Sequence, residues 1–248
     1  MNIVVAMKQI PDLAQIRIKD RKPVLTDVPL TFGSLDKNAL EAAVQLKNSA
    51  GGTVYALAVG SEDLEDTIKE ALAAGADETL LLTDDEYANL ESDQTAVLIA
   101  DRIKKMNDAG IILLGEGSGD NYSGQMPGRL ADLLDVPVIG YAKSLELNGT
   151  TVTAVCSLED CEETVQAQTP VVISVVSDIN EIRIPAVTEI LKAGKKPKEV
   201  LDADDVEIEI PAASVKTLTS LAPESNRKCI SVKDVAELIE KIKAENLL

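Results

Sequence analysis

The chain has 248 residues, of which 45% are hydrophobic, and this is enough to fill the core of one large domain or of one domain with an extension. Aromatic residues make up only 2%, so we expect a core of aliphatic side chains and no stacking of ligands on aromatic platforms. The 42 acidic and 24 basic residues give a formal net charge of −18, which argues against binding to nucleic acids or anionic membranes.

The sequence lacks histidine and has few cysteines. Histidine is absent, which excludes Ser-His-Asp and Cys-His catalysis and metal sites built on histidine. The cysteines, Cys156, Cys161 and Cys229, form no CxxC pair and match no common zinc or iron–sulfur spacing. We therefore predict no catalytic side chain and no metal site, and we expect the cysteines to be buried or incidental thiols.

The sequence has no recognisable targeting or membrane-spanning segment. Its first residues run directly into an apolar strand pattern, without the layout of a signal peptide. No apolar run approaches the roughly 20 residues that a membrane span needs. We expect a cytoplasmic protein with no membrane span.

The first part of the chain alternates short apolar runs with helical patterns, and Ser61 is expected to cap one of the helices. A hairpin is expected at residues 15–25. The expected strands are residues 3–7, 53–59, 78–83, 111–114 and 137–141. The expected helices are residues 32–51, 61–74, 92–106 and 126–134. This alternation predicts right-handed βαβ units on a mostly parallel sheet.

A glycine-rich loop, Gly115–Gln125, joins the fourth of these strands to the helix that follows it. Glycines at every second position let the backbone approach a ligand closely, and the first N–H groups of the helix have no partners within it. Asp120, Asn121 and Ser123 can bond a ribose or an adenine edge, or they can cap the helix. The residues leave both interpretations open, a nucleotide site and a loop that only caps the helix.

Three separate segments are expected to meet at one edge of the sheet. Residues 6–8, Val59–Gly60 and the glycine-rich loop each lie at the end of a strand or directly after one. Ligands of parallel sheets bind beyond the carboxyl ends of the strands, so these segments predict one shared crevice. Because the chain is strongly acidic, local backbone donors must hold any anionic ligand there.

The later part of the chain changes to alternating and then to polar patterns. Residues 184–197 are apolar at the start and rich in lysine at the end, which indicates either a contact surface or a helix whose lysines stabilise its C-terminal end. Residues 199–227 are expected to form an arm with little core of its own, and 231–247 an amphipathic helix. The expected strands, antiparallel and extending or flanking the first sheet, are residues 145–147, 151–155, 163–168 and 171–176.

The expected fold class is therefore α/β, with a mostly parallel sheet, flanking helices, antiparallel additions and a C-terminal arm with a terminal helix. We divide the chain into an α/β domain at residues 1–198 and a C-terminal part at residues 199–248, which is expected to pack on a partner subunit because its helix has an apolar face to cover.

Four segments together match the pattern of one known family, and they are residues 4–12, 36–43, 67–77 and 186–197. On these residues the chain resembles the β subunit of electron-transfer flavoproteins along essentially its whole length. The glycine-rich loop, with Ser177–Asn180 and Ile184–Pro185, is most similar to the branch associated with carnitine reduction, nitrogen fixation and anaerobic reductases.

The resemblance implies a fold of the adenine-nucleotide-binding type and a heterodimer with an α subunit that holds FAD. Such heterodimers carry electrons between a dehydrogenase or reductase of the acyl-CoA type and an acceptor such as ferredoxin or a quinone reductase. Simple members bind AMP in the β subunit, whereas bifurcating members bind a second FAD there and accept hydride from NADH. The expected nucleotide-binding residues are Ala6, Lys8, Val59, Gly60, Gly117, Ser118, Asp120, Asn121, Tyr122, Ser123, Gly124, Gln125 and Met126.

The glycine-rich loop separates this chain from the simple members, and residues 184–192 match another part of the family. The simple members read Asn-Gln-Thr-Gly-Gln in the loop, whereas this chain reads Asn121-Tyr-Ser-Gly-Gln125, which favours FAD over the alternative AMP and implies electron bifurcation with NAD(H) as a substrate. Residues 184–192 match the family's recognition loop, with Val187 where an anchoring leucine is common. The expected partner contacts are Ile184, Val187, Ile190 and Leu191.

The sequence is compatible with three functions. The leading hypothesis is an electron-transfer subunit of an oxidoreductase complex, whose chemistry belongs to bound flavin. Its rival is a stand-alone adenine-nucleotide-binding protein. A nucleotide-dependent hydrolase or ligase ranks last because no P-loop motif is present. Copurification with a larger flavin-binding subunit separates the first from the other two.

Overall fold

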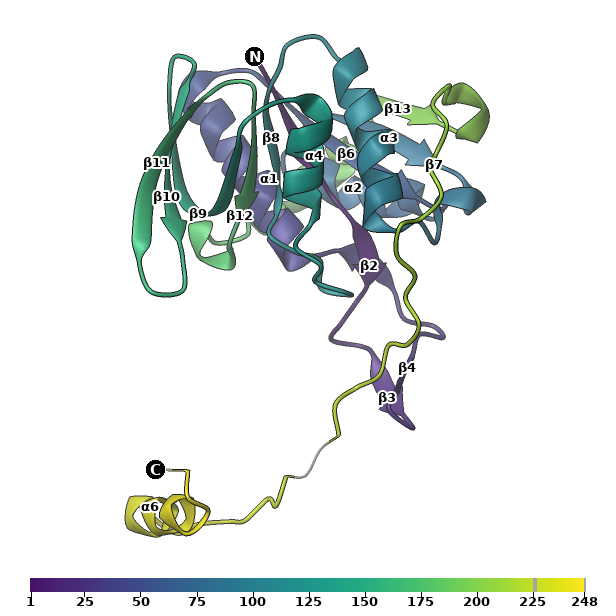
Figure 1. Ribbon diagram of the computed structural model, residues 1–248. Coiled ribbons are helices and arrows are strands. Elements are labelled where there is room, and N and C mark those ends of the chain that lie inside the picture. The colour runs from purple at the N-terminus through teal and green to yellow at the C-terminus, as the bar shows by residue number, and fades with distance from the viewer. Residues whose placement is uncertain (225–226, 248) are drawn as a thin grey trace. The chain divides into compact units, whose positions relative to one another are not determined.

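The structure, a computed structural model, describes residues 1–224 and 227–247. By their contacts these residues form two units, one of residues 1–16 with 25–218 and a smaller one of residues 17–24 with the chain from 219 onward. The larger unit is a mixed α/β structure around one large sheet (Figure 1). This confirms the fold class that the sequence predicts.

The large sheet has nine strands among the described residues, and most of it is parallel. In spatial order the strands are β11 (Glu162–Gln168), β10 (Thr151–Ser157), β9 (Val138–Asn148), β12 (Val171–Val175), β8 (Ala109–Gly115), β1 (Asn2–Ala6), β6 (Thr53–Gly60), β7 (Glu78–Thr83) and β13 (Lys198–Leu201). In this order, all neighbouring strands from β9 onward are parallel to each other, whereas β10 runs antiparallel to both of its neighbours, β11 and β9.

Helices cover both faces of this sheet. Helices α1 (Ser34–Ala50) and α2 (Leu64–Ala74) pack on one face, and α3 (Ser92–Lys105) and α4 (Met126–Leu134) on the other. Helix α5 (Val187–Ala193) lies against α2. In the described part of the chain, no helix is both long and apolar enough to cross a bilayer. The short elements of this unit are β2 (Gln9–Pro11), β5 (Leu30–Phe32) and the 3-10 turns η1 (Asp85–Tyr87), η2 (Ser177–Ile179) and η3 (Ala203–Asp205).

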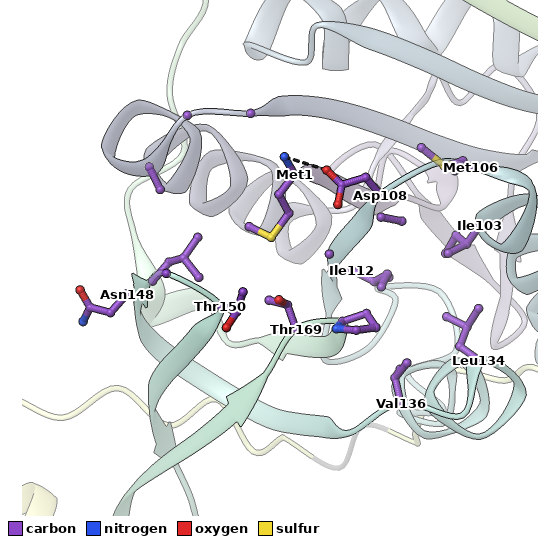
Figure 2. A pocket seen from close by; sticks show the side chains of 18 of the residues that line it. Met1, Ile103, Met106, Asp108, Ile112, Leu134, Val136, Asn148, Thr150 and Thr169 are labelled. Carbon is purple, nitrogen blue, oxygen red and sulfur yellow. Dashed lines mark ion pairs between the residues drawn. The ribbon is translucent and has the colours of Figure 1, made fainter.

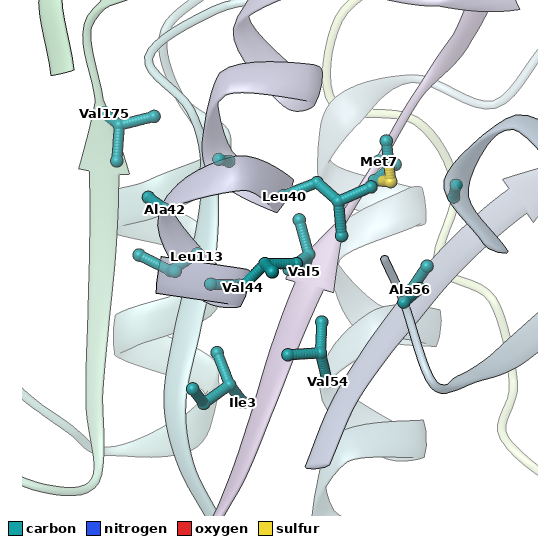
Figure 3. Close-up of a cluster of buried hydrophobic side chains, with 14 of the residues drawn as sticks. Ile3, Val5, Met7, Leu40, Ala42, Val44, Val54, Ala56, Leu113 and Val175 are labelled. Atoms are coloured by element: carbon teal, nitrogen blue, oxygen red, sulfur yellow. The ribbon is translucent and has the colours of Figure 1, made fainter. Parts of the chain in front are cut away.

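Strand β1 shows how the sequence builds the two-sided core. Its side chains alternate between faces, so Ile3 and Val5 join the cluster on the α1 side and Val4 joins the cluster on the α3 side. Figure 3 shows Ile3 and Val5 packed against Leu40 and Val44 of α1. Each aliphatic side chain buried in this way contributes about 1.5–3 kcal/mol. Because both faces are covered, the central strands are continuously apolar rather than alternating.

The order of the strands creates a switch point between β1 and β8. From β1 the chain moves through α1 to β6 and through α2 to β7, and it then returns through α3 to β8 on the other side of β1. The helices that leave β1 and β8 consequently cover opposite faces of the sheet. In open α/β sheets such a switch point leaves a crevice beyond the carboxyl ends of the two strands.

The structure corrects three expectations about individual elements. Residues 171–175 form β12, a parallel strand between β9 and β8 rather than an antiparallel addition. The expected strand at 137–141 and the segment at 145–147 are parts of one long strand, β9. Ser61 is not the cap of α2, which begins at Leu64 and has Asp63 as its N-cap residue. The two strand errors arise because buried parallel strands and antiparallel edges share the same apolar residue types.

The segment after residue 198 begins inside the large unit. Strand β13 pairs with β7, and Leu201, Val206 and Ile208 pack against a cluster around Leu82 and Tyr87. This stretch thus has more core contact than the arm that the sequence predicts. The boundary after residue 198 stays a prediction about which part packs on a partner. Parts of the expected arm and of the C-terminal part, residues 225–226 and 248, lie outside the described residues.

The smaller unit contains the expected hairpin and the terminal helix. Strands β3 (Arg17–Lys19) and β4 (Lys22–Val24) form the hairpin, and Arg21 at its turn accepts a backbone hydrogen bond from Ala222 at 2.7 Å. The Arg21 side chain also pairs with Glu224 at 2.7 Å. Helix α6 (Val235–Ala244) begins after Asp234, whose carboxylate accepts a hydrogen bond from the N–H of Glu237 at 2.9 Å.

Candidate functional site

A crevice lies beyond the carboxyl ends of β1, β6 and β8, at the switch point of the sheet, and its volume is about 190 Å³. The three segments that the sequence places at this edge do meet there. The predicted residues that line the crevice are Ala6, Lys8, Val59, Gly60, Gly117, Ser118, Asn121, Ser123, Gly124 and Met126. Their assignment as nucleotide-binding residues stays a prediction, because position alone does not identify a ligand.

Three predicted residues stand outside the lining. Tyr122 is 56% exposed, and its hydroxyl donates a hydrogen bond to Glu116, which raises the pKa of Tyr122. Asp120 pairs with Lys8 at the mouth of the crevice. Gln125 is the N-cap residue of α4, and its side-chain oxygen accepts a hydrogen bond from Arg129 at 2.8 Å.

Part of the lining comes from residues that the sequence did not identify. One wall is formed by the segment leading into α3 and by the first turns of that helix, including Leu90, Ser92, Thr95 and Ile99. Tyr87 lies in η1, after β7. Leu90 and the residues of α3 lie farther along the chain from the end of β7, so the rule that ligands gather at strand ends does not predict them. The packing of α3 beside β6 brings them to the crevice.

Asp36 bridges the two strands on either side of the switch point. It lies in the first turn of α1, and it is buried, with 7% of its surface exposed. Its Oδ2 atom accepts a hydrogen bond from the backbone N–H of Lys8 at 2.8 Å, and Oδ1 accepts one from Gly115 at 3.3 Å. Lys8 follows β1 and Gly115 ends β8, so one carboxylate fixes the spacing of the crevice floor.

Burial sets the titration of Asp36. Removal of the carboxylate from water raises its pKa to about 6, although the hydrogen bonds from Lys8 and Gly115 act in the opposite direction. One signal for this role is visible in the sequence, an acidic residue beside an apolar helix face, but such residues usually face solvent. Only the fold reveals that this one turns inward.

Two glycines of the loop are required by geometry. A Cβ atom on Gly115 would lie 2.6 Å from the Cβ atom of Leu35 and 3.0 Å from the Asp36 carboxylate, so only glycine permits this approach of α1. Gly124 has a φ of +65°, a left-handed conformation that side chains with a Cβ rarely adopt. The loop backbone therefore reaches the crevice in a shape that few other sequences allow.

A second cavity, of about 860 Å³, opens at the opposite edge of the sheet, where β1 and β8 begin. Figure 2 shows its apolar wall of Ile103, Ile112 and Leu134, together with the ion pair at 3.0 Å between the Met1 ammonium group and Asp108. This cavity is larger than the crevice. We nevertheless place the candidate site in the crevice, because ligands of parallel sheets bind at the carboxyl ends of the strands.

The predicted partner segment lies on and before α5, and its apolar side chains face solvent. Ile184 is 93% exposed, Val187 72%, Ile190 55% and Leu191 73%. The chain just before them is held on α1, because Arg183 pairs with the buried Glu41. A fixed backbone thus presents an uncovered apolar surface.

The lysines beside this segment have different roles. Lys196 donates hydrogen bonds to the carbonyl oxygens of Leu72 at 2.7 Å and Ala76 at 2.6 Å, at the end of α2, and burial lowers its pKa. It therefore anchors the segment, whereas the exposed residues Lys192, Lys195 and Lys198 remain available to a partner. Lys192 lies in the last turn of α5, as the helix-end interpretation expects, whereas the contact surface stays a prediction.

The sequence of this chain is similar to those of one known family. The family model described as the electron transfer flavoprotein domain matches residues 24–206. An electron transfer flavoprotein subunit beta from Thermoanaerobacterium thermosaccharolyticum is 32% identical over 92% of this chain and 90% of its own length. The subunit of the same name from Clostridium acetobutylicum is 33% identical over 97% and 93%. That from Megasphaera elsdenii is 32% identical over the full length of both chains.

Replacement of Asp36 should change how stability depends on pH. The raised pKa, against an ordinary value of 3.8, means that the native state binds a proton between about pH 6 and pH 4 that the unfolded chain lacks. The stability of the wild type relative to Asp36→Asn should therefore increase as the pH falls through this window, by about 3 kcal/mol in total. Urea unfolding of both proteins from pH 4 to pH 8 measures this difference. A difference that stays constant, or that grows with rising pH, would contradict the assignment.

Proposed function

We propose a function for the chain from one premise: it belongs to the electron transfer flavoprotein family, as a β subunit. We propose that it forms a heterodimer with an FAD-bearing α subunit and that the pair carries electrons between redox partners. We further propose that the crevice at the switch point holds an adenine nucleotide. The observation that supports this site most strongly is the convergence of a glycine-rich loop, a strand end and a lysine on one crevice.

The residues of the crevice fit an adenine nucleotide. Gly117 and Gly124 keep the loop backbone open to a phosphate, and Ser118, Asn121 and Ser123 supply polar groups for phosphate or sugar oxygens. The wall from α3 and β6 supplies aliphatic surface for a base. Polar groups at the loop and apolar surface opposite are the usual arrangement of a small-molecule pocket.

We propose FAD as this nucleotide, with its adenylate part in the crevice. When bound, the flavin supplies hydride acceptance and single-electron transfer, which no side chain of this chain provides. The departure at Tyr122 and Ser123 supports FAD, as does the resemblance to the branch of anaerobic reductases. NADH as the hydride donor and electron bifurcation rest on that resemblance.

AMP is the second candidate, and the size of the crevice favours it. A volume of about 190 Å³ is below the range of roughly 300–1,000 Å³ in which drug-sized ligands are buried. FAD is larger than AMP, so its flavin ring would have to extend out of the crevice toward the partner subunit. A heterodimer with AMP in this position would be a simple, non-bifurcating electron-transfer flavoprotein.

The exposed surface of α5 is proposed as the docking site for redox partners. Its apolar side chains lie beside free lysines in an acidic protein, so a partner with an apolar centre and an acidic rim complements them. We propose a dehydrogenase or reductase of the acyl-CoA type as this partner, and ferredoxin or a quinone reductase as a further partner of the heterodimer. The cytoplasm as its location stays a prediction.

Helix α6 is proposed to pack on the α subunit. Val235, Leu238 and Ile239 form an apolar stripe on it, and their exposed fractions are 70%, 43% and 41%. A ten-residue helix with such a stripe is marginal in water unless another surface covers it. Because the chain belongs to the electron transfer flavoprotein family, we propose that the α subunit covers this stripe.

Cofactor counting tests the choice between FAD and AMP. We expect the purified heterodimer to contain two FAD per pair of subunits and to lose its flavin absorbance when NADH is added. Extraction with acid, followed by chromatography, measures flavin and AMP per mole of heterodimer. One FAD with one AMP and no response to NADH would reject the FAD assignment and support a simple electron-transfer flavoprotein.

Gly124→Val should lower the nucleotide content of the β subunit. The φ of +65° strains any β-branched residue by about 1–3 kcal/mol, so the loop backbone must move and its approach to the phosphate is lost. Gly149→Val is the matched control, because Gly149 has a φ of +64° but lies in the turn between β9 and β10, away from the crevice. The control should keep its nucleotide at the wild-type level. Equal nucleotide contents in the two folded variants would contradict the assignment of the glycine-rich loop as a nucleotide site.

Val187→Asp should slow electron transfer to the docking partner by about tenfold or more, because it places a charge at the centre of a desolvated contact. Bound cofactor should stay unchanged. Val215→Asp is the control, since Val215 is also exposed, at 52%, but lies outside the α5 segment. Stopped-flow reduction by the partner dehydrogenase measures the rate. Equal rates in the two variants, or loss of cofactor from Val187→Asp, would argue against docking at α5.

A further inference from the structure

Among the described residues, the lining of the crevice contains one positively charged side chain that could bind an anionic ligand. Asp36 and Glu116 contribute carboxylates to its lining. Of the residues that the structure describes, Lys8 is the only lysine or arginine in that lining. A ligand with a phosphate group therefore depends on the ammonium group of Lys8 to offset these two carboxylates.

That ammonium group already has an anionic partner. Lys8 Nζ lies 2.6 Å from Asp120 Oδ2, and the exposed fractions of the two side chains are 47% and 33%. Lys8 follows β1 and Asp120 belongs to the loop after β8, so the pair joins the two sides of the crevice. Asp120 itself does not line the crevice. It holds the lysine from outside the space that a ligand would occupy.

Asp120 is ionised at neutral pH. Burial acts to raise its pKa, but hydrogen bonds from Lys8 and Ser118 outweigh this effect and hold the pKa below its ordinary value. The carboxylate is therefore an anion in direct contact with the one cation of the lining. It engages the same ammonium group that a phosphate of the ligand needs.

The relative strengths of the two interactions decide which anion holds Lys8. A half-exposed ion pair contributes only about 0–1 kcal/mol, because water screens it and two long side chains must be ordered. A phosphate offers more charge and more acceptor oxygens, and hydrogen bonds between charged groups contribute about 1.5–3 kcal/mol. The phosphate therefore displaces the carboxylate, but at the cost of breaking the existing pair.

We infer that Asp120 is a specificity-determining residue, which holds the Lys8 ammonium group in the free protein and is displaced from it by the phosphate of the bound nucleotide. This inference rests on the proposed function of the crevice. It changes the role of Asp120 from a ligand of the nucleotide to an internal competitor of its phosphate. Nucleosides without a phosphate cannot displace Asp120, so the ion pair favours nucleotides over nucleosides.

A double-mutant cycle tests the inference, with AMP and adenosine as the probes. The proteins are the wild type, Asp120→Asn, Lys8→Met and the double variant, each purified as the full chain with its copurifying subunit and freed of nucleotide. Calorimetric titration measures each dissociation constant. Asp66→Asn is the control, because Asp66 pairs with Lys69 at the same distance, 2.6 Å, but outside the crevice.

We expect Asp120→Asn to bind AMP about two- to fivefold more tightly than the wild type, because Lys8 is released. Lys8→Met should bind AMP about tenfold or more weakly. Adenosine binding should change in neither variant, and Asp66→Asn should match the wild type. In the Lys8→Met background, the change Asp120→Asn should no longer strengthen AMP binding.

Two results would overturn the inference. Weaker or unchanged binding of AMP by Asp120→Asn would identify Asp120 as a direct ligand or as a residue without influence. An equal gain from Asp120→Asn with and without Lys8 would reduce its role to general charge repulsion. A titration of the wild type with FAD completes the test: binding of neither AMP nor FAD would refute the proposed function together with this inference, and this outcome is distinguishable because all variants would then fail alike.

Discussion

The hydrogen bonds of Asp36 connect α1 to the backbone at the floor of the crevice. One buried carboxylate at the start of α1 accepts hydrogen bonds from two backbone N–H groups, one after β1 and one at the end of β8. The switch point of the sheet lies between these two strands. Without the carboxylate, two backbone N–H groups at the floor of the crevice would lose their partner. Burial of the carboxylate disfavours its ionised form, so these two hydrogen bonds are kept against a free-energy cost.

Much of the fold follows from patterns that are visible in the sequence. Runs such as Ile3–Met7 and 111–114 predict central strands, and the glycine-rich loop predicts the turn where the crevice lies. The sequence could not show that β12 is inserted between β8 and β9, because a short apolar run fits a parallel and an antiparallel position equally well. It also could not show the inward turn of Asp36 or the wall from α3, since both depend on how helices pack on the finished sheet.

The acidity of the chain gives single basic groups an unusual importance. With a net charge of −18, the overall field opposes an anionic ligand, and local donors must overcome it. Lys8 at the crevice and the exposed lysines beside α5 are therefore the places where an anion or an acidic partner is favoured. Both sites lie on backbone that is fixed by buried side chains, Asp36 in one case and Glu41 in the other. The fold thus places its few cations on rigid supports.

We propose that the crevice at the carboxyl ends of β1 and β8, and not the larger cavity at their amino ends, binds an adenine nucleotide. Hydrogen–deuterium exchange of the full chain, with its copurifying subunit, in the presence and absence of AMP tests this directly. With AMP bound, we expect slower exchange in peptides that cover residues 6–12 and 115–126, with no change at residues 104–112 and 147–152. Protection confined to the latter two segments would contradict it.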